Sequence, residues 1–172
     1  EESQKSGGIT IGARDILLAY NVNIDDPDPY VAQQIGSIVR SSGRLLKSPD
    51  GSQKFRTGGL LLGVQGMGVP LESHGISQVS MNLQDYKTIN LHHAFDTIDS
   101  LSKNMNSATK GSELVGLVPL DAMLEAGRWY GGDGLTESEY IDVAVEKLGL
   151  NSISNFNPKE RIIEWAIMER ES

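Results

Sequence analysis

The sequence predicts an α+β domain, and three observations support this prediction. Apolar and polar residues alternate in two segments, 16–24 and 76–86, as they do in strands with one buried face. Apolar residues recur at helical spacing in two others, 28–43 and 90–105. Along the chain these patterns follow the order strand, helix, strand, strand, helix, strand, and further helical patterns come after them.

The first strand, residues 16–24, ends in the sequence Asn-Val-Asn-Ile-Asp. Because successive strand residues point to opposite faces, its apolar side chains share one face while Asn21 and Asn23 share the other. Amides have a poor intrinsic preference for strands, and solvated strand faces more commonly use Lys, Glu or Thr. We interpret this polar face as a binding surface, and a merely solvated face is the alternative.

A helix is predicted after this strand. Asp28 can accept a bond from a free backbone N–H group, and Pro29 suits the first helical position. Apolar residues then fall on one stripe, and Gly43 suits a left-handed stop. The segment that follows, LLKSPDGSQKFRTGG, is rich in turn formers and predicts a loop.

Two further strands, 60–69 and 76–86, are predicted to form a hairpin around the sequence PLESHG. A long helix, 90–105, comes next, and the sequence SELVGLVPL then predicts a short buried strand closed by Pro119. One face of the second hairpin strand is entirely polar and consists of Gln78, Ser80, Asn82 and Gln84.

This order of elements is the split βαβ arrangement (βαββαβ) of ferredoxin-like domains. In that arrangement two helices cover one face of a four-stranded sheet, and strands one and three are central neighbours. Their polar residues should therefore meet on the uncovered face, where amides and hydroxyls suit a flat heterocycle or a partner backbone. The predicted ligand-binding residues on this face are Asn21, Asn23, Gln65, Gln78, Ser80 and Asn82.

The chain beyond about residue 120 is predicted to be a helical extension within a single domain, 1–172, whose core spans about 8–120. Its sequence TESE at 136–139 is a capping box, and Asn157 followed by Pro158 begins a last helix. We expect these helices to dock on the covered side or at an edge of the sheet.

Composition narrows the classes of function. The chain has no cysteine, which excludes disulfides and thiolate metal sites. Its formal charge of -8 argues against duplex nucleic acid or an anionic membrane as the main partner. No apolar run of bilayer length and no signal-peptide pattern is present, so a cytoplasmic protein is expected. The start at Glu1, without methionine, suggests a fragment of a longer protein or a processed product.

Few residues point to catalysis or metal binding. His92 and His93 are adjacent and diverge by about 100° on a helix, so they cannot jointly chelate one ion. We expect structural roles for them and for His74, and no metal. The sequence GVQGMG does not lead into a helix and therefore lacks the helix N-terminus that binds phosphate. Its glycines are interpreted as sites where another backbone or a ligand approaches the sheet closely.

Five stretches go beyond these patterns: ITIGARDILLAYNVNI, VQGMGVPL, QVSMNLQDY, GSELVGLVPL and FNPKERIIEW. They occur in the order and approximate spacing of the C-terminal subdomain of glutamate formiminotransferase, also called formimidoyltransferase. The resemblance covers roughly residues 7–166, which is nearly the whole chain.

The resemblance implies a folate-dependent transferase of one-carbon metabolism and histidine catabolism. In that family the formimino group of N-formimino-glutamate passes to N5 of tetrahydrofolate, and folate lies in a tunnel between the sheets of two ferredoxin-like subdomains. The amide-rich face would then line this tunnel. The resemblance also implies that a remnant of the folate-contacting loop lies at Gly7, Gly8, Ile9 and Thr10.

A departure from the family is equally informative. The family's catalytic histidine belongs to an N-terminal subdomain that this sequence does not contain, so we expect no catalytic residue here and no activity of the chain alone. The expected partners are that subdomain, tetrahydrofolate and formimino-glutamate. A homo-oligomer is also expected because a sheet face is left uncovered. A formyl group is the alternative to formimino as the transferred group.

Basic residues suggest two further ligand-binding roles. Arg14 could hold a carboxylate of folate or glutamate with two parallel bonds, and an ion pair with Glu113 is the alternative. A second group of basic residues suits the polyglutamate tail of cellular folates, or else belongs to a solvated loop. This group is Arg40, Arg44, Lys47, Lys54 and Arg56.

Two other classes of function compete with the transferase. A non-enzymatic folate-related binding or dimerisation module would use the same face without turnover. RNA binding through an open ferredoxin-like sheet needs aromatic side chains on the central strands for base stacking, and the corresponding positions here are amides and serine. The sequence therefore favours the transferase or the module over an RNA-binding protein.

Overall fold

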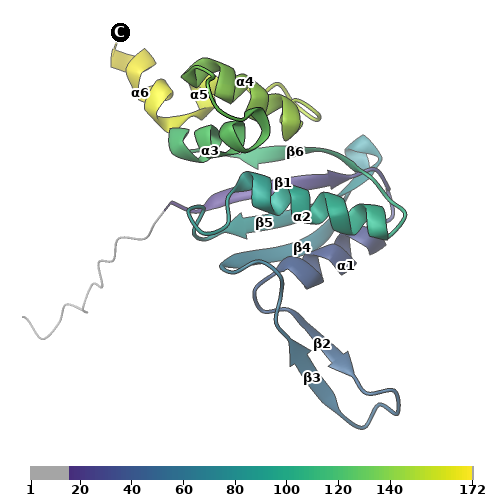
Figure 1. Cartoon of the computed structure of the whole chain (residues 1–172). Coiled ribbons are helices and arrows are strands. Elements are labelled where there is room, and N and C mark those ends of the chain that lie inside the picture. The colour runs from purple at the N-terminus through teal and green to yellow at the C-terminus, as the bar shows by residue number, and fades with distance from the viewer. Residues whose placement is uncertain (1–15, 172) are drawn as a thin grey trace, which may run out of the picture.

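Four strands form the central sheet of the computed structural model, which describes residues 16–171 (Figure 1). They are β1 (Leu18–Ile24), β4 (Val64–Leu71), β5 (Ile76–Leu83) and β6 (Thr109–Val115). Neighbours follow the order β4-β5-β1-β6, and each adjacent pair is antiparallel. β1 and β5 are central, as predicted, and the strand order is that of ferredoxin-like domains.

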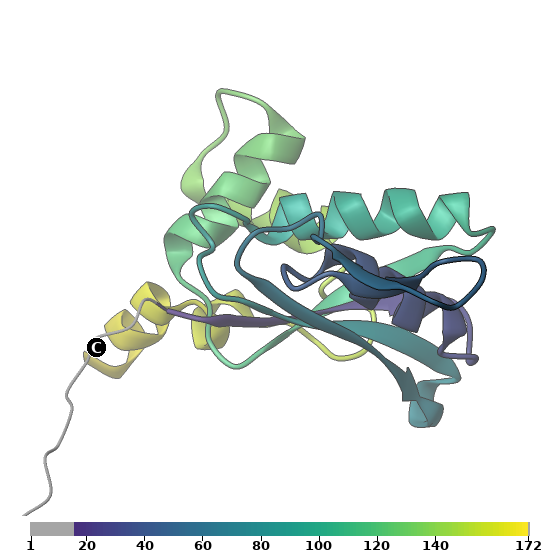
Figure 2. The same cartoon turned by 90° about the horizontal axis from the view of Figure 1, so that it is seen from below.

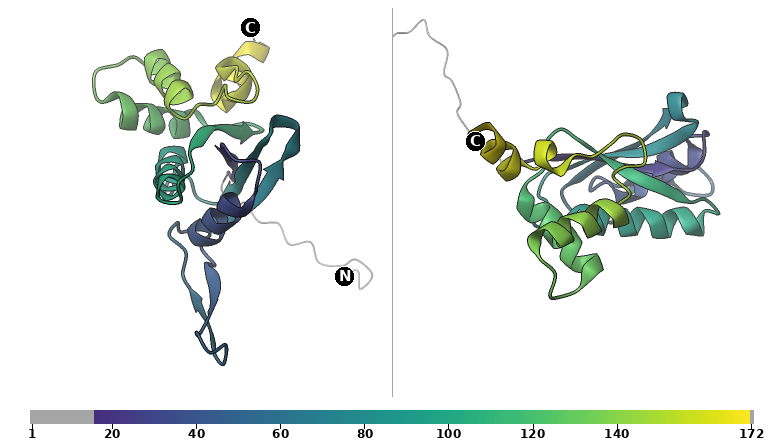
Figure 3. Two further views of the ribbon diagram at one scale, coloured as in Figure 1. Left: turned by 90° about the vertical axis from the view of Figure 1, so that its right-hand side faces the viewer. Right: turned by 90° about the horizontal axis from the view of Figure 1, so that it is seen from above.

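Two helices, α1 (Tyr30–Val39) and α2 (Leu91–Asn104), cover one face of this sheet (Figures 1 and 3). The Tyr30 N–H donates to the Asp28 carboxylate at 2.9 Å, at the predicted start of α1. Asn90 caps α2, because its side chain accepts the Leu91 N–H at 2.7 Å and its own N–H donates to the ring of His93. The predicted α+β fold class is confirmed.

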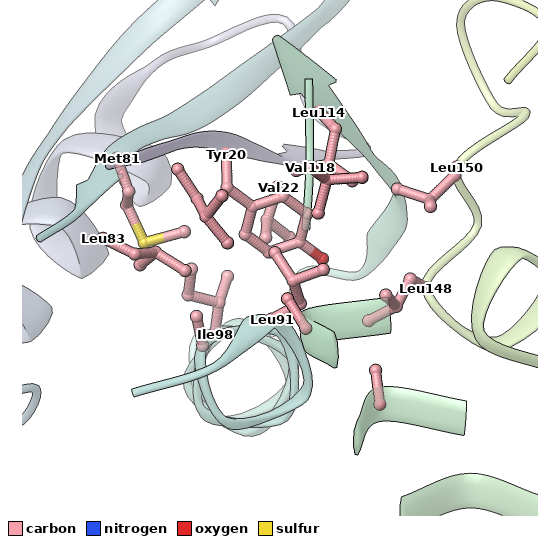
Figure 4. Packing of buried hydrophobic residues seen from close by; sticks show 14 of the residues in the cluster. Tyr20, Val22, Met81, Leu83, Leu91, Ile98, Leu114, Val118, Leu148 and Leu150 are labelled. Atoms are coloured by element: carbon pink, nitrogen blue, oxygen red, sulfur yellow. The ribbon is translucent and has the colours of Figure 1, made fainter. Parts of the chain in front are cut away.

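The hydrophobic core lies between the sheet and these helices (Figure 4). Tyr20 and Val22 are fully buried, since alternate residues of β1 point toward the helices. The Tyr20 hydroxyl donates to Ser112 Oγ at 2.9 Å, and Ser112 donates onward to the Leu148 carbonyl at 2.6 Å. Burial raises the pKa of Tyr20 far above its ordinary value, so the phenol remains a neutral donor. This relay connects β1 and β6 to the C-terminal extension.

Glycines allow α1 to approach β4 closely. A Cβ atom at Gly68 would lie 2.1 Å from the backbone nitrogen of Gln33, and one at Gly36 would lie 2.8 Å from the carbonyl carbon of Met67. Only glycine on both elements permits this backbone separation. The prediction that glycines of GVQGMG admit another backbone is therefore confirmed, and the backbone is that of α1.

The extension consists of α3 (Leu120–Gly131), α4 (Glu137–Lys147), α5 (Pro158–Arg161) and α6 (Ile163–Glu171). Figure 2 shows α3 beside the start of α2, on the helix-covered side of the sheet. Two α3 side chains donate to Asp96 of α2, Trp129 at 2.9 Å and Tyr130 at 2.7 Å. The capping box predicted at Thr136 is present. The extension therefore docks on the side where it was expected.

The segment predicted as a loop is instead a two-stranded ribbon, so that prediction was wrong. β2 (Arg44–Lys47) pairs with β3 (Lys54–Thr57), and the ribbon extends away from the sheet (Figure 1). Its turn is closed by Asp50, whose carboxylate accepts bonds from the hydroxyl groups of Ser48 and Ser52, and these bonds lower the pKa of Asp50 to about 2. The turn formers therefore terminate a hairpin, and the residues on either side of them pair.

Several predicted boundaries moved. The first predicted helix ends at Val39, before the predicted stop at Gly43. In two other places backbone groups found different partners. The N–H groups of Leu60 and Leu61 donate to the carbonyls of Ile38 and Val39, which finishes α1, so β4 begins only at Val64. The last predicted helix is interrupted at Ile162, where an isolated parallel bridge pairs the chain with Val118. A short 3-10 turn, Glu72–His74, closes the predicted β4–β5 hairpin.

Candidate binding surface

The polar residues of the central strands do share the helix-free face of the sheet. In the observed register Asn21 lies opposite Ser80, Asn23 opposite Gln78, and Gln65 opposite Asn82. The residues between them point into the core. We call this surface the amide face, and it comprises Asn21, Asn23, Gln65, Gln78, Ser80, Asn82 and Glu113.

Glu113 was missed as a member of this surface, since the sequence pointed to it only as a partner of Arg14. It lies on edge strand β6 directly opposite Asn21 and is half-buried. Its neighbours Ser112 and Leu114 are buried, so strand alternation places its carboxylate on the helix-free face. The same alternation, applied to SELVGLVPL, could have found it.

Hydrogen bonds connect one half of the amide face. The Gln78 side-chain nitrogen donates to Asn23 Oδ1 at 2.8 Å and to Glu113 Oε2 at 3.4 Å. Asn21 donates to the same Glu113 oxygen at 3.5 Å. Asn23 donates to the hydroxyl of Ser152 at 2.9 Å, which belongs to the loop after α4. The C-terminal extension thus reaches one end of the face.

Accessibility divides the predicted residues into two groups. Asn23 is fully buried and Gln78 is 4% exposed, so both orient their neighbours from beneath the surface. Asn21, Ser80 and Asn82 are half-buried and can meet a ligand directly; Gln65 is exposed. Strand alternation in the sequence placed all of these side chains on one face. It did not indicate that the loop with Ser152 would contact Asn23.

A hollow of about 320 Å³ opens between β4 and β5 beside the accessible amides. The Asn82 amide donates to Gln65 Oε1 at 3.5 Å on its floor. Apolar side chains stand around the amide face, with Met67 59% and Val115 52% exposed. Apolar side chains beside a small number of placed polar groups are a common feature of ligand-binding pockets. The lining residues are Arg40, Gln65, Gly66, Met67, Ser80, Met81 and Asn82.

Of the other predicted binding residues, only Arg40 is placed at this surface within residues 16–171, where it lines the hollow. Gly7, Gly8, Ile9, Thr10 and Arg14 lie outside the described residues. In the basic group, Arg40 donates to the Gly43 carbonyl at 2.8 Å and Arg56 to the Ser42 carbonyl at 3.0 Å. These two guanidinium groups therefore hydrogen-bond to the backbone at the start of the ribbon. Lys47 and Lys54 are exposed near its turn.

The histidines have structural environments away from the amide face. His92 is 5% exposed and stacks on Trp129 with ring centroids 5.2 Å apart. Burial, followed by the neighbouring His93, lowers the pKa of His92 to about 4, against the opposing effect of Asp96. His74 contacts Ser73 in the turn after β4. Within residues 16–171, no group of three or more potential ligands is placed to hold a metal ion.

Comparison with known proteins identifies the family. The chain belongs to the formiminotransferase domain family, whose model matches residues 19–168, so the resemblance predicted from sequence is confirmed. It is 38% identical over 165 residues to formimidoyltransferase-cyclodeaminase of Gallus gallus, covering 94% of this chain and 29% of the relative. The corresponding Dictyostelium discoideum protein is 36% identical over 167 residues, covering 95% and 29%.

A shorter relative carries the transferase name alone. Glutamate formimidoyltransferase of Streptococcus pyogenes is 32% identical over 126 residues, covering 73% of this chain and 37% of the relative. The chain thus spans between about a quarter and two fifths of the length of these relatives. In the part of the chain that is described, no helix is long and apolar enough to cross a membrane.

Proposed function

We propose that this chain forms one wall of the folate site of a glutamate formimidoyltransferase. The reaction moves a formimino group between N-formimino-glutamate and N5 of tetrahydrofolate. The observation that carries the proposal is the amide face, a sheet surface rich in neutral hydrogen-bonding groups, in a chain of the formiminotransferase family. Tetrahydrofolate acts as co-substrate, and the expected setting is the cytoplasm.

The chemistry of the amide face fits the pterin ring of folate. The ring is flat and carries N–H donors and acceptors along its edge, which side-chain amides can match in both senses. Asn21, Ser80 and Asn82 are accessible for such bonds on two adjacent strands. Met67 and Val115 on the rim supply apolar surface for the aromatic parts of the ligand.

The transfer step itself needs a proton to move between the two amines, and no described histidine lies on the amide face. N5 of tetrahydrofolate bonds to the formimino carbon and loses its proton, the bond from that carbon to the glutamate nitrogen breaks, and the leaving amine takes up a proton. The described histidines lie elsewhere, with His92 and His93 beside Trp129 of α3. We therefore assign proton transfer to an N-terminal formiminotransferase subdomain facing this sheet, and the chain alone is expected to be inactive.

Ligand binding and transfer test the proposal directly. The chain, paired with an N-terminal formiminotransferase half, should bind 5-formyltetrahydrofolate in calorimetry and transfer the formimino group. Asn82→Leu should weaken binding at least about tenfold, since an unpaired ligand polar group is costly to bury. Gln53→Leu, in the exposed ribbon turn, is the matched control and should leave binding unchanged. Absence of binding by the unmodified pair at high micromolar ligand would contradict the proposal.

A non-enzymatic binding or dimerisation module is the second candidate. The uncovered sheet with its exposed apolar side chains Met67 and Val115 favours it because such a surface also suits a second protein. Adding an authentic N-terminal subdomain separates the two candidates. Restored transfer supports the enzyme, whereas stable association without turnover, or homo-oligomer formation alone, supports the module.

A further inference from the structure

We infer that Glu113 is the specificity-determining acceptor of the amide face and receives a pair of adjacent N–H donors from the ligand. This inference rests on the proposed folate-dependent function and assigns a residue to it. The required ligand edge is amidine-like, with two N–H groups on one carbon. Two parts of the substrates carry that edge: the 2-amino-4-oxopyrimidine ring of the pterin and the formimino group.

The Glu113 carboxylate is incompletely satisfied by the protein. Its Oε2 accepts from Asn21 at 3.5 Å and from Gln78 at 3.4 Å, and both distances are long for a bond to a charged acceptor. Among residues 16–171, no lysine, arginine or histidine lies within ion-pair distance of it. A half-buried carboxylate in this setting has capacity for stronger donors.

The carboxylate also orients the amides around it. Because an ionised carboxylate only accepts hydrogen bonds, the nitrogens of Asn21 and Gln78 turn toward Glu113 and their oxygens face elsewhere. The Gln78 nitrogen is further committed to Asn23 at 2.8 Å. The groups left unbonded near Glu113 are therefore acceptors, its own Oε1 and the side-chain oxygen of Asn21.

An acceptor-rich site selects a particular class of ligand edge. Two parallel N–H···O bonds to one carboxylate combine geometric specificity with a strong, charge-assisted interaction. A carboxylate-bearing part of the ligand would be repelled, so the glutamate moieties of both substrates lie away from Glu113. The flat sheet around Asn21 and Ser80 further suits a planar edge laid across β1 and β5.

A ligand series combined with one substitution tests the inference in the polypeptide that carries this chain together with an N-terminal formiminotransferase half. Glu113→Gln keeps the size of the side chain but replaces one acceptor oxygen by a donor. We expect it to weaken binding of 5-formyltetrahydrofolate by about ten- to a hundredfold, the range for hydrogen bonds to charged groups. Glu146→Gln, an exposed carboxylate change on α4, is the matched control and should have no effect.

A folate analogue tests the same contact from the ligand side without changing the protein. The 2-desamino-2-methyl analogue lacks the amino donor, so the unmodified protein should bind it about as weakly as Glu113→Gln binds the parent ligand. The variant should no longer distinguish the two ligands. If instead Glu113→Gln weakens only N-formimino-glutamate, the donor pair belongs to the formimino group, and the assignment of Glu113 stands.

The remaining outcomes overturn the inference. Unchanged affinity of Glu113→Gln for both substrates, with folate still bound, rejects the role of Glu113 and leaves the proposed function intact. No folate binding by the unmodified pair rejects both. Equal losses of thermal stability in Glu113→Gln and Arg14→Gln, with ligand affinities unchanged, identify an internal ion pair in place of a binding residue.

Discussion

Asn21 and Asn23 show how residues with the same strand parity acquire different roles. Both side chains leave β1 on the helix-free face, two positions apart. Asn21 remains half-buried beside Glu113, whereas Asn23 is fully buried and bonded to Ser152. Strand alternation determines the face on which a side chain lies, and more distant segments determine whether it remains accessible.

His92 gives a pH-dependent prediction at this scale. Its pKa is lowered from 6.5 to about 4 in the folded protein, so below pH 6.5 the unfolded state binds its proton more readily. The contribution of the neutral ring to the free energy of unfolding is complete above pH 6.5. It decreases by up to about 3 kcal/mol as the pH falls toward 4. Denaturant unfolding between pH 7 and 4 should show this decrease.

His92→Phe isolates the contribution of this ring, because it keeps an aromatic partner for Trp129 and removes the titrating nitrogen atoms. The difference in unfolding free energy between the unmodified chain and this variant should change with pH in the same interval. His74→Phe, at an exposed turn, is the control and should leave the pH profile unaltered. Parallel profiles for the unmodified chain and His92→Phe would refute the assignment.

At the level of elements, the glycine pattern of β4 determines how α1 packs. Gly66 and Gly68 face α1, while the alternate residues Gln65 and Met67 face the opposite side. The glycines of GVQGMG therefore serve helix packing, although the sequence resembles a nucleotide-binding loop.

Gly68→Ala tests this packing. Its Cβ would lie 2.1 Å from the Gln33 backbone nitrogen, so α1 must move, and unfolding free energy should fall by about 1–3 kcal/mol. Gly58→Ala is the matched control, since a Cβ there meets nothing within 4 Å. Urea unfolding of both variants measures the difference. Equal stability of the two would show that α1 and β4 are not in close contact.

Across the whole molecule, the additions to the sheet leave Gln65 exposed and Asn21, Ser80 and Asn82 half-buried on the amide face. α3 donates two hydrogen bonds to Asp96 of α2. After β6, Val118 forms an isolated parallel bridge with Ile162. The ribbon projects from the opposite end (Figure 1). Within residues 16–171, the Ser152 loop contacts the amide face at the end occupied by Asn23.

Removal of the ribbon tests whether it is independent of the fold. Replacing 44–57 with a short Gly-Ser linker joins positions already close together, since the Gly59 N–H donates to the Ser41 carbonyl at 3.3 Å. A lone hairpin contributes little stability, so the unfolding midpoint should remain nearly unchanged. Circular dichroism during heating measures this. Loss of cooperative unfolding would show that the ribbon supports the core.

The sequence alone determined the order of the main sheet and helix elements, the parity of the central strands, the caps at Asn157 and Thr136, and the family. These properties depend on local periodicity or on residues a few positions apart, which a single chain displays directly. The ribbon was mistaken for a loop because its two strands have only four residues each and flank a run of turn formers, and strand pairing is a tertiary property. Tertiary structure also decided the burial of Asn23 and the placement of Glu113 beside Gln78, since the interacting residues lie far apart along the chain.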